Sequence, residues 1–77
     1  MKIQILYFAS LRDTLGKAED RLVCDADISA AQVWKRVNPD CKIPSNILVA
    51  VNQDYICLDT LLTTDAELAF FPPVTGG

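Results

Sequence analysis

The chain has 77 residues, enough for one domain with a single core and too few for a second core. Apolar residues make up 51% of it, so it can fill such a core and is not a disordered segment. Seven basic against ten acidic residues, with no histidine, give a formal net charge of −3. This balance argues against nucleic acid or an anionic membrane as a partner and favours a basic or mixed-charge protein. The longest apolar runs, of about five residues, are far too short for a membrane span or a signal-peptide core.

The cysteines Cys24, Cys41 and Cys57 are odd in number and lack CxxC or zinc-ligand spacing. We therefore expect no disulfide framework and no metal site, and a reducing cytoplasm is the natural setting. Cys24 and Cys57 are expected to be buried as small apolar residues, and Cys41, in a polar loop, to be exposed. A sulfur relay through Cys24 or Cys57 is the weaker alternative, since thiolates can carry out that chemistry.

The first strand is predicted over residues 2–8, where polar and apolar residues alternate. This period of two places Ile3, Ile5 and Tyr7 on the core side. Phe8 then lies on the opposite face of the strand.

A short helical turn is expected over residues 9–15. Gly16 is placed to end it in a left-handed conformation. Residues 19–24 are predicted to form a second strand that pairs back with the first.

The main helix is predicted over residues 25–37. Ser29 and Gln32 form a capping-box pattern near its start, and an Asn–Pro pair ends it. Asp25 and Asp27 are interpreted as favourable charge at the helix N-terminus, not as an acid–base pair. The apolar stripe that would lie across a sheet consists of Ala30, Val33, Trp34 and Val37.

Two further strands are predicted over residues 47–51 and 66–71. The unbroken apolar character of residues 47–51 indicates a central strand that is covered at least partly on both faces. Residues 52–54 are expected to turn. The leucine-containing segment 58–62 is expected to be irregular but anchored in the core.

A hairpin, one crossing helix and further strands predict an α+β fold, a mixed sheet with one main helix packed across it. The order ββαββ is that of the β-grasp (ubiquitin-like) roll, in which the first and last strands lie side by side at the sheet centre. We expect residues 1–71 to form this domain and residues 72–77 to form an extended tail.

The tail reads Pro72-Pro73-Val74-Thr75-Gly76-Gly77. The two prolines restrict φ and hold the chain extended. The two glycines offer no side chain to pack, so the domain gains no stability from them. They do offer a thin tail with an unhindered carboxylate, which an enzyme with a narrow channel could reach. A frayed end without function is the alternative interpretation.

A docking face follows from the strand pattern. If the first and last strands are neighbours, the outward rings of Phe8 and Phe71 meet, and Tyr55 could join them. An exposed aromatic patch on a small domain usually marks an interface. Arg12 and Lys17 would border this patch and could pair with acidic groups of a partner. The alternatives are that the helical turn covers the rings and that the two basic side chains are only solvated.

Three segments resemble the MoaD family, the small subunits of molybdopterin synthase: YFASLRD at 7–13, AVNQ at 50–53 and AFFPPVTGG at 69–77. The resemblance spans the whole chain, and PPVTGG is its most specific part. Sulfur carriers for thiamine biosynthesis and ubiquitin-related modifiers share the fold and the Gly-Gly end, but not the Phe-Pro-Pro lead-in. One departure is Thr64-Asp65-Ala66-Glu67, where the family commonly has a Gly-Asp-Glu turn. A different turn geometry is needed there.

The resemblance implies that an E1-like activating enzyme, using ATP and magnesium, adenylates Gly77, and that a persulfide relay converts it to a thiocarboxylate. The tail would then enter the large catalytic subunit, which passes the sulfur to cyclic pyranopterin monophosphate. The chain would be a non-catalytic carrier within a heterotetramer, binding no cofactor itself. Two other functions remain open: a protein modifier joined through Gly77 to lysines, or a sulfur carrier for another pathway such as thiamine. An interaction domain with an inert tail is a further alternative.

Overall fold

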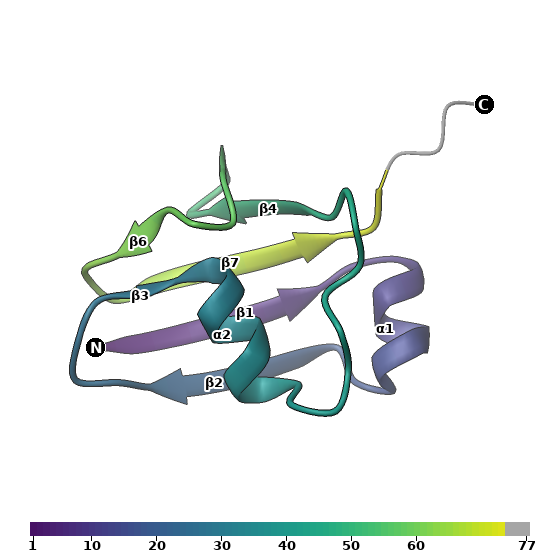
Figure 1. The fold of residues 1–77 in the computed structure, drawn as a ribbon, viewed down its shortest axis with the longest axis horizontal. Helices are drawn as coiled ribbons and strands as arrows, with labels where there is room; N and C mark the ends of the chain where they lie inside the picture. The colour runs from purple at the N-terminus through teal and green to yellow at the C-terminus, as the bar shows by residue number, and fades with distance from the viewer. Residues whose placement is uncertain (74–77) are drawn as a thin grey trace.

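The computed structural model describes residues 1–73 of the chain. The main sheet consists of β1 (Lys2–Tyr7), β2 (Glu19–Val23), β4 (Leu48–Val51), β5 (Asp54–Ile56) and β7 (Ala66–Phe71). The remaining elements are α1 (Ser10–Leu15), β3 (Ile28–Ser29), α2 (Ala30–Val37) and β6 (Leu61–Leu62). The five strands lie in the order β2-β1-β7-β4-β5, and β3 pairs with β6 in a separate small sheet. Helix α2 crosses one face of the main sheet, and α1 lies at the end where β7 ends (Figure 1).

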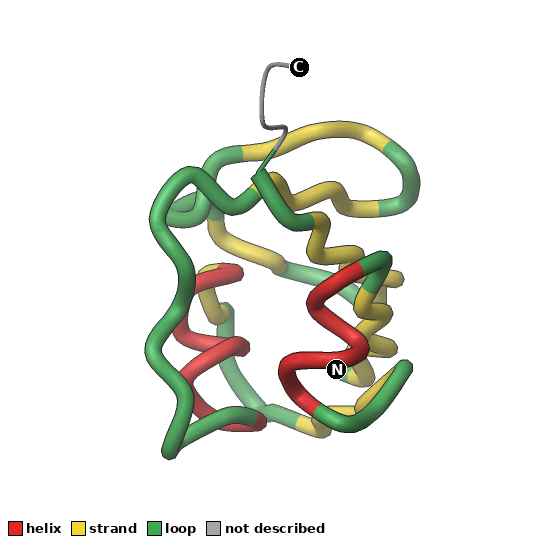
Figure 2. The backbone as a smooth tube through the Cα atoms, turned by 90° about the vertical axis from the view of Figure 1, so that its right-hand side faces the viewer, coloured by secondary structure: helices red, strands yellow, loops and turns green. Residues whose placement is uncertain are grey.

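The first and last strands lie side by side at the centre of the sheet, as predicted. β1 and β7 run parallel, with Tyr7 opposite Phe70, whereas β2 and β4 are antiparallel to their neighbours. Figure 2 shows the two layers from the side, with α2 and the loop after it on the left and the strands of the main sheet on the right. This topology confirms the predicted β-grasp fold with a mixed sheet and one main helix.

The core lies between the sheet and α2. The predicted alternation in β1 is confirmed, because Ile3, Ile5 and Tyr7 are all buried. Trp34 belongs to the core as predicted. Its ring packs edge-on to the Phe70 ring, with ring centroids 5.0 Å apart. The largest side chains of this core, all nearly inaccessible to solvent, are Trp34, Tyr7, Phe70, Ile3, Ile5, Leu68 and Val33.

Helix α2 begins at Ala30, so the predicted start at residue 25 is wrong. The capping box itself is confirmed: the Ser29 amide donates to Gln32 Oε1 at 2.9 Å, and the Gln32 amide donates to Ser29 Oγ at 3.2 Å. Ser29 has extended backbone and belongs to β3, so the helix cannot continue backwards through it. Asp25 and Asp27 consequently lie in the loop ahead of β3. They are not in the first turn, and the interpretation as helix-terminus charge is wrong.

The segment between β4 and β7 is more regular than predicted. Residues 54–56 form β5, although the turn was expected to reach residue 54, and Leu61 and Leu62 form β6. Because neighbouring side chains of a strand point to opposite faces, Leu62 is buried while Leu61 is 56% exposed. Strand β4 is flanked on both sides, and its adjacent residues Val49 and Ala50 are both buried, as expected for a strand covered on both faces.

The cysteines follow the predictions only in part. Cys24 is buried as expected, whereas Cys41, predicted to be exposed, is half-buried. Cys57 is exposed, which corrects the prediction of burial. It lies in a tight turn between β5 and β6, where the Thr60 amide donates to the Cys57 carbonyl oxygen at 3.1 Å. A turn at the surface leaves its first side chain in solvent.

The turn at residues 63–66 needs no glycine. None of these residues has a positive φ, so the missing family glycine is not replaced by a strained residue. Asp65 Oδ1 accepts a hydrogen bond from the Lys2 amide at 2.7 Å, which ties this turn to the start of β1.

The β4–β5 turn provides a test of backbone strain. Its central residues Asn52 and Gln53 have φ of 49° and 76°, the left-handed pair that a two-residue hairpin requires. A left-handed residue other than glycine costs roughly 1–2 kcal/mol. A glycine at this position removes that cost, but its greater freedom in the unfolded state cancels about 0.5–1 kcal/mol of the gain. We expect Gln53→Gly to raise the free energy of unfolding by about 0.5–1 kcal/mol in urea denaturation. The control Gln53→Ala keeps the strain; equal stability of the two variants would contradict the prediction.

Candidate functional site

The face of the sheet that α2 does not cover carries a row of apolar side chains. Register places Leu6 beside Ala69, Ala69 beside Ala50, and Ala50 beside Tyr55 across four adjacent strands. One step further along, Phe71 lies opposite Leu48. Since side chains alternate along a strand, all of these residues share one face. Sequence analysis had not assigned Leu6 or Leu48 to the site. The alternation of β1 already places Leu6 on the same face as Phe8, whereas the position of Leu48 depends on the register of β4 and β7.

Three aromatic rings meet at one end of this row, and we call Phe8, Tyr55 and Phe71 the aromatic patch. Phe8 and Phe71 stack with ring centroids 4.7 Å apart and planes within 9°. The Tyr55 ring is tilted, 6.2 Å from Phe71. Phe8 is 39% and Tyr55 72% exposed, so the alternative in which the α1 turn covers these rings is wrong. The predicted meeting of the three rings is confirmed; their role in binding remains a prediction.

The patch lies at the end of the molecule from which the tail continues. Strand β7 ends at Phe71, and Pro72 and Pro73, both half-buried, follow directly. Figure 1 shows the end of β7 beside α1, the helix that follows Phe8. The tail residues Val74, Thr75, Gly76 and Gly77 lie outside the described residues, so their predicted roles are not tested by the structure.

The two basic residues expected beside the patch differ in position. Arg12 is exposed on α1, one helical turn after Phe8. Lys17 instead turns to the helix-covered side, where Nζ lies 2.6 Å from Asp20 Oδ2 and donates to the Val37 carbonyl oxygen at 3.1 Å. Its predicted place at the border of the patch is therefore wrong, because two nearby acceptors hold the ammonium group on the other side of the sheet.

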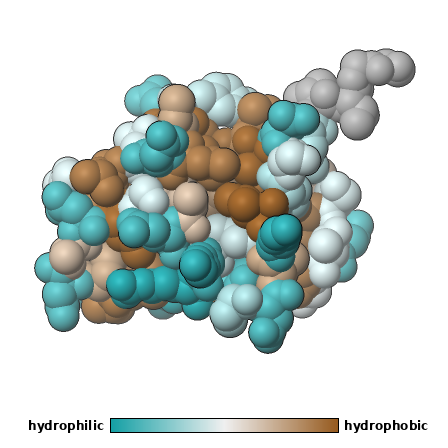
Figure 3. Space-filling view, viewed as in Figure 1, coloured by the Kyte–Doolittle hydropathy of each residue, from teal (hydrophilic) through white to brown (hydrophobic). Residues whose placement is uncertain are grey.

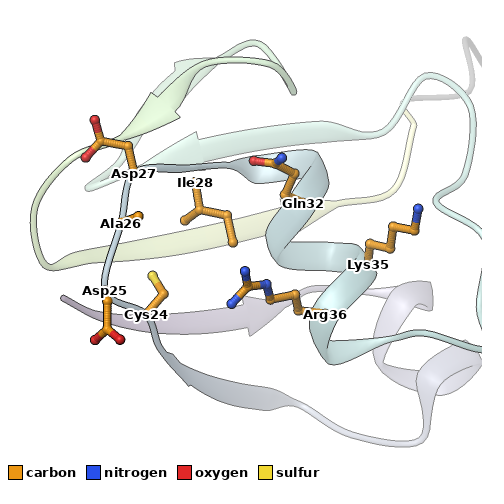
Figure 4. A pocket seen from close by; sticks show the side chains of 8 residues that line it. All are labelled: Cys24, Asp25, Ala26, Asp27, Ile28, Gln32, Lys35 and Arg36. Carbon is orange, nitrogen blue, oxygen red and sulfur yellow. The ribbon is translucent and has the colours of Figure 1, made fainter.

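The opposite face offers hollows instead of an apolar row. Figure 3 shows that face, where apolar surface is interleaved with hydrophilic side chains. A hollow of about 540 Å³ lies between α2 and the loop before β3. In Figure 4 the Arg36 guanidinium and the Cys24 thiol extend into this space, whereas the carboxylates of Asp25 and Asp27 point outward. Among residues 1–73 no three His, Cys, Asp or Glu side chains are grouped to hold a metal ion, and no helix there is long and apolar enough to cross a membrane.

The fold and this exposed patch define the chain as a ubiquitin-like β-grasp protein. Two solved structures share the fold over nearly the whole chain. SAMP1 from Haloferax volcanii has a TM-score of 0.77 at 25% identity and covers 100% of both chains. The small archaeal modifier protein 1 from Methanosarcina acetivorans has a TM-score of 0.65 at 23% identity, covering 99% of this chain and 96% of that one.

Sequence comparisons give the family. The model of the ThiS family matches residues 5–77, and the chain belongs to this family. It is 37% identical to the molybdopterin synthase sulfur carrier subunit of Escherichia coli (strain K12), over 97% of this chain and 99% of that protein. It is 30% identical to the subunit of that name from Homo sapiens, over 99% of this chain and 94% of that protein. The resemblance seen in the sequence motifs is thereby confirmed.

Proposed function

We propose that this chain is the sulfur carrier subunit of a molybdopterin synthase. The observation that carries the proposal is the stacking of exposed Phe8 on half-buried Phe71, the residue directly before the Pro-Pro lead-in to the Gly-Gly tail. An aromatic anchor of this kind suits a protein partner. Its position lets one partner bind the patch and receive the tail at the same time. The two relatives of 37% and 30% identity bear the name of this subunit.

The proposed chemistry takes place at the Gly77 carboxylate. A carboxylate is a poor electrophile, because attack on it would have to expel an oxide. An E1-like activating enzyme, with ATP and magnesium as its own substrate and cofactor, converts it to an acyl-adenylate and releases pyrophosphate. A persulfide sulfur then attacks the carbonyl carbon and displaces AMP, and reductive cleavage of the sulfur–sulfur bond by a thiol leaves the thiocarboxylate. The carrier contributes the reactive end and the docking face.

The partner that consumes this sulfur is the large catalytic subunit. The tail enters its active site and the thiocarboxylate sulfur passes to cyclic pyranopterin monophosphate. The chain contains no histidine. The acid, base and phosphate-binding groups of the reaction are therefore assigned to the large subunit. Assembly as a heterotetramer in the cytoplasm is part of this proposal.

A protein modifier is the second candidate, in which Gly77 forms an isopeptide bond with lysines of target proteins. The observation that favours it is the likeness to SAMP1 from Haloferax volcanii, at 25% identity and a TM-score of 0.77. A sulfur carrier for thiamine biosynthesis would use the same activation chemistry. The two classes differ in the nucleophile that displaces AMP, sulfur in a carrier and a lysine amine in a modifier.

Intact mass spectrometry separates these candidates. The chain is incubated with an activating enzyme, ATP and a sulfur donor, with a reaction lacking ATP as control. We expect a mass gain that corresponds to one sulfur in exchange for one oxygen, and its loss when the large subunit and cyclic pyranopterin monophosphate are added, with formation of molybdopterin. Ladders of heavier conjugates would support the modifier instead. An unchanged mass would contradict both.

A further inference from the structure

A polar cluster behind the aromatic patch has no part in the proposed chemistry. The Tyr7 hydroxyl donates to Asp20 Oδ2 at 2.9 Å and accepts from Asn38 Nδ2 at 2.9 Å. Lys17 Nζ lies 2.6 Å from the same Asp20 oxygen and donates to the Val37 carbonyl oxygen. We call Tyr7, Lys17, Asp20 and Asn38 the Tyr7 cluster. It joins β1, β2 and the loop before β2 to the C-terminal end of α2.

The Tyr7 hydroxyl does more than fill the core. The Tyr7 ring packs against the Phe70 and Trp34 rings, with ring centroids 6.1 Å and 6.0 Å apart. A phenylalanine ring would make the same contacts. The hydroxyl adds two bonds to different elements, and a buried hydroxyl must be paired. Burial, and also the Asp20 carboxylate, raises the pKa of Tyr7 well above its usual range. The hydroxyl therefore keeps its proton and remains a donor.

The Tyr7 cluster holds together the two ends of segment 8–16, which carries Phe8. Tyr7 directly precedes this segment and Lys17 directly follows its last residue, Gly16. The Tyr7 amide donates to the Ala18 carbonyl oxygen at 2.9 Å, so the two ends also meet through the backbone. Asn38 donates to the Tyr7 hydroxyl and Lys17 donates to the Val37 carbonyl oxygen, so both ends of the segment are attached to the end of α2.

Phe8 itself makes two backbone hydrogen bonds. Its amide donates to the Phe70 carbonyl oxygen at 3.1 Å, and its carbonyl oxygen accepts from the Leu11 amide at 3.2 Å. The next residue, Ala9, has φ 53° and ψ −131°, a backbone conformation that a residue with a side chain rarely adopts. Such a conformation persists only where the surrounding structure enforces it. The backbone direction after Phe8 is therefore fixed by the hydrogen bonds of Phe8 and by the structure that enforces the Ala9 conformation.

We propose that the Tyr7 cluster positions Phe8 against Phe71 and so holds the aromatic patch in the shape that a partner binds. This inference rests on the proposed function, in which the patch docks the large subunit. Tyr7 and Lys17 are positioning residues that act through Phe8. Without the cluster, the Phe8 ring has to be ordered during binding, and that ordering lowers the affinity.

The test uses Tyr7→Phe in the full-length chain, with two measurements. The first is the NMR chemical shifts of the Phe8 and Phe71 ring protons in the free chain, which report stacking directly. The second is the dissociation constant for the large subunit. We expect the ring shifts to move and the dissociation constant to rise roughly two- to thirtyfold, the range for changes in networks that reach a binding site only indirectly. The rate of sulfur transfer at saturating large subunit should stay unchanged.

The matched control is Ile28→Val in β3, at the opposite end of the sheet from α1 (Figure 1). Ile28 is buried, so this variant loses core packing while the Tyr7 cluster stays complete. It should leave both the ring shifts and the dissociation constant unchanged. A Tyr7→Phe variant with wild-type ring shifts and wild-type affinity would overturn the proposal.

The same measurements also decide two other cases, a variant that does not fold and a wild-type chain that does not bind. If Tyr7→Phe does not fold, Lys17→Met decides by the same ring shifts and affinity, since the Lys17 side chain is 33% exposed and its loss disturbs the core less. If the wild-type chain does not bind the large subunit, the proposed function fails. The ring shifts of the free variants then still confirm or overturn the positioning of Phe8.

Discussion

Deletion of Gly77 is expected to reduce sulfur transfer to background while the domain remains folded. The shortened chain ends on the Gly76 carboxylate, which stops one residue, about 3.3–3.6 Å, short of the position of the reacting Gly77 carbonyl carbon. Replacement of Gly76 by tryptophan should have the same effect, because a bulky side chain blocks a channel shaped for glycine. The fold should be unaffected, because glycine offers no side chain to pack into the core. Thiocarboxylate formation by intact mass, molybdopterin formation and thermal unfolding are the measurements.

Gly76→Ala provides the graded control for this prediction. It adds one methyl group and should reduce transfer less than tryptophan does. Molybdopterin formation at the wild-type rate by the chain without Gly77 would refute the role of the tail. A large fall in melting temperature for either variant would refute the claim that the fold does not depend on it.

Phe71→Ala is expected to weaken binding to the large subunit or the activating enzyme by roughly 1–4 kcal/mol, the range for truncating an aromatic anchor at an interface. The ring stacks on Phe8 at 4.7 Å and is only half-buried in the free chain. The free energy of unfolding should therefore fall by about 1–2 kcal/mol, from lost stacking and partial burial. Titration calorimetry and urea denaturation on the same variant measure both quantities.

The neighbouring residue supplies the control. Phe70 points to the other face of β7 and is fully buried. Phe70→Ala should cost roughly 3–5 kcal/mol of stability, as truncation of a core phenylalanine does. If Phe71→Ala instead shows the larger stability loss together with normal affinity for both partners, Phe71 serves the fold, and the proposed docking face is wrong.

The two six-residue strands, β1 and β7, were predictable from local pattern. The alternation in β1 placed Tyr7 inside and Phe8 outside, and the last strand was predicted with its observed bounds at Ala66 and Phe71. Each of these strands is long enough for a period of two to be read. The capping box at Ser29 also followed from residue type and spacing, because it depends only on residues three apart.

The three shortest strands could not be predicted from local pattern. β3 and β6 have two residues each and β5 has three, too few to show any period. They exist because register with a partner strand satisfies their backbone hydrogen bonds. Strand pairing also explains why α2 begins at Ala30 and not at the predicted residue 25. Ile28 and Ser29 pair with β6, and this pairing competes with helical geometry.

For the candidate site, the sequence by itself determined which residues could act. The alternation put Phe8 and Phe71 on the outward side of their strands, and the glycine and proline pattern marked the tail. Only the tertiary structure decided which of these side chains meet. The stacking of Phe8 on Phe71 depends on the parallel pairing of β1 with β7 across most of the chain length. Lys17 was misplaced for the same reason: its acceptors, Asp20 and the Val37 carbonyl, are brought together by packing of the hairpin against the end of α2. Local pattern specifies which face a residue occupies, whereas a partner distant in the chain is specified only when the core closes.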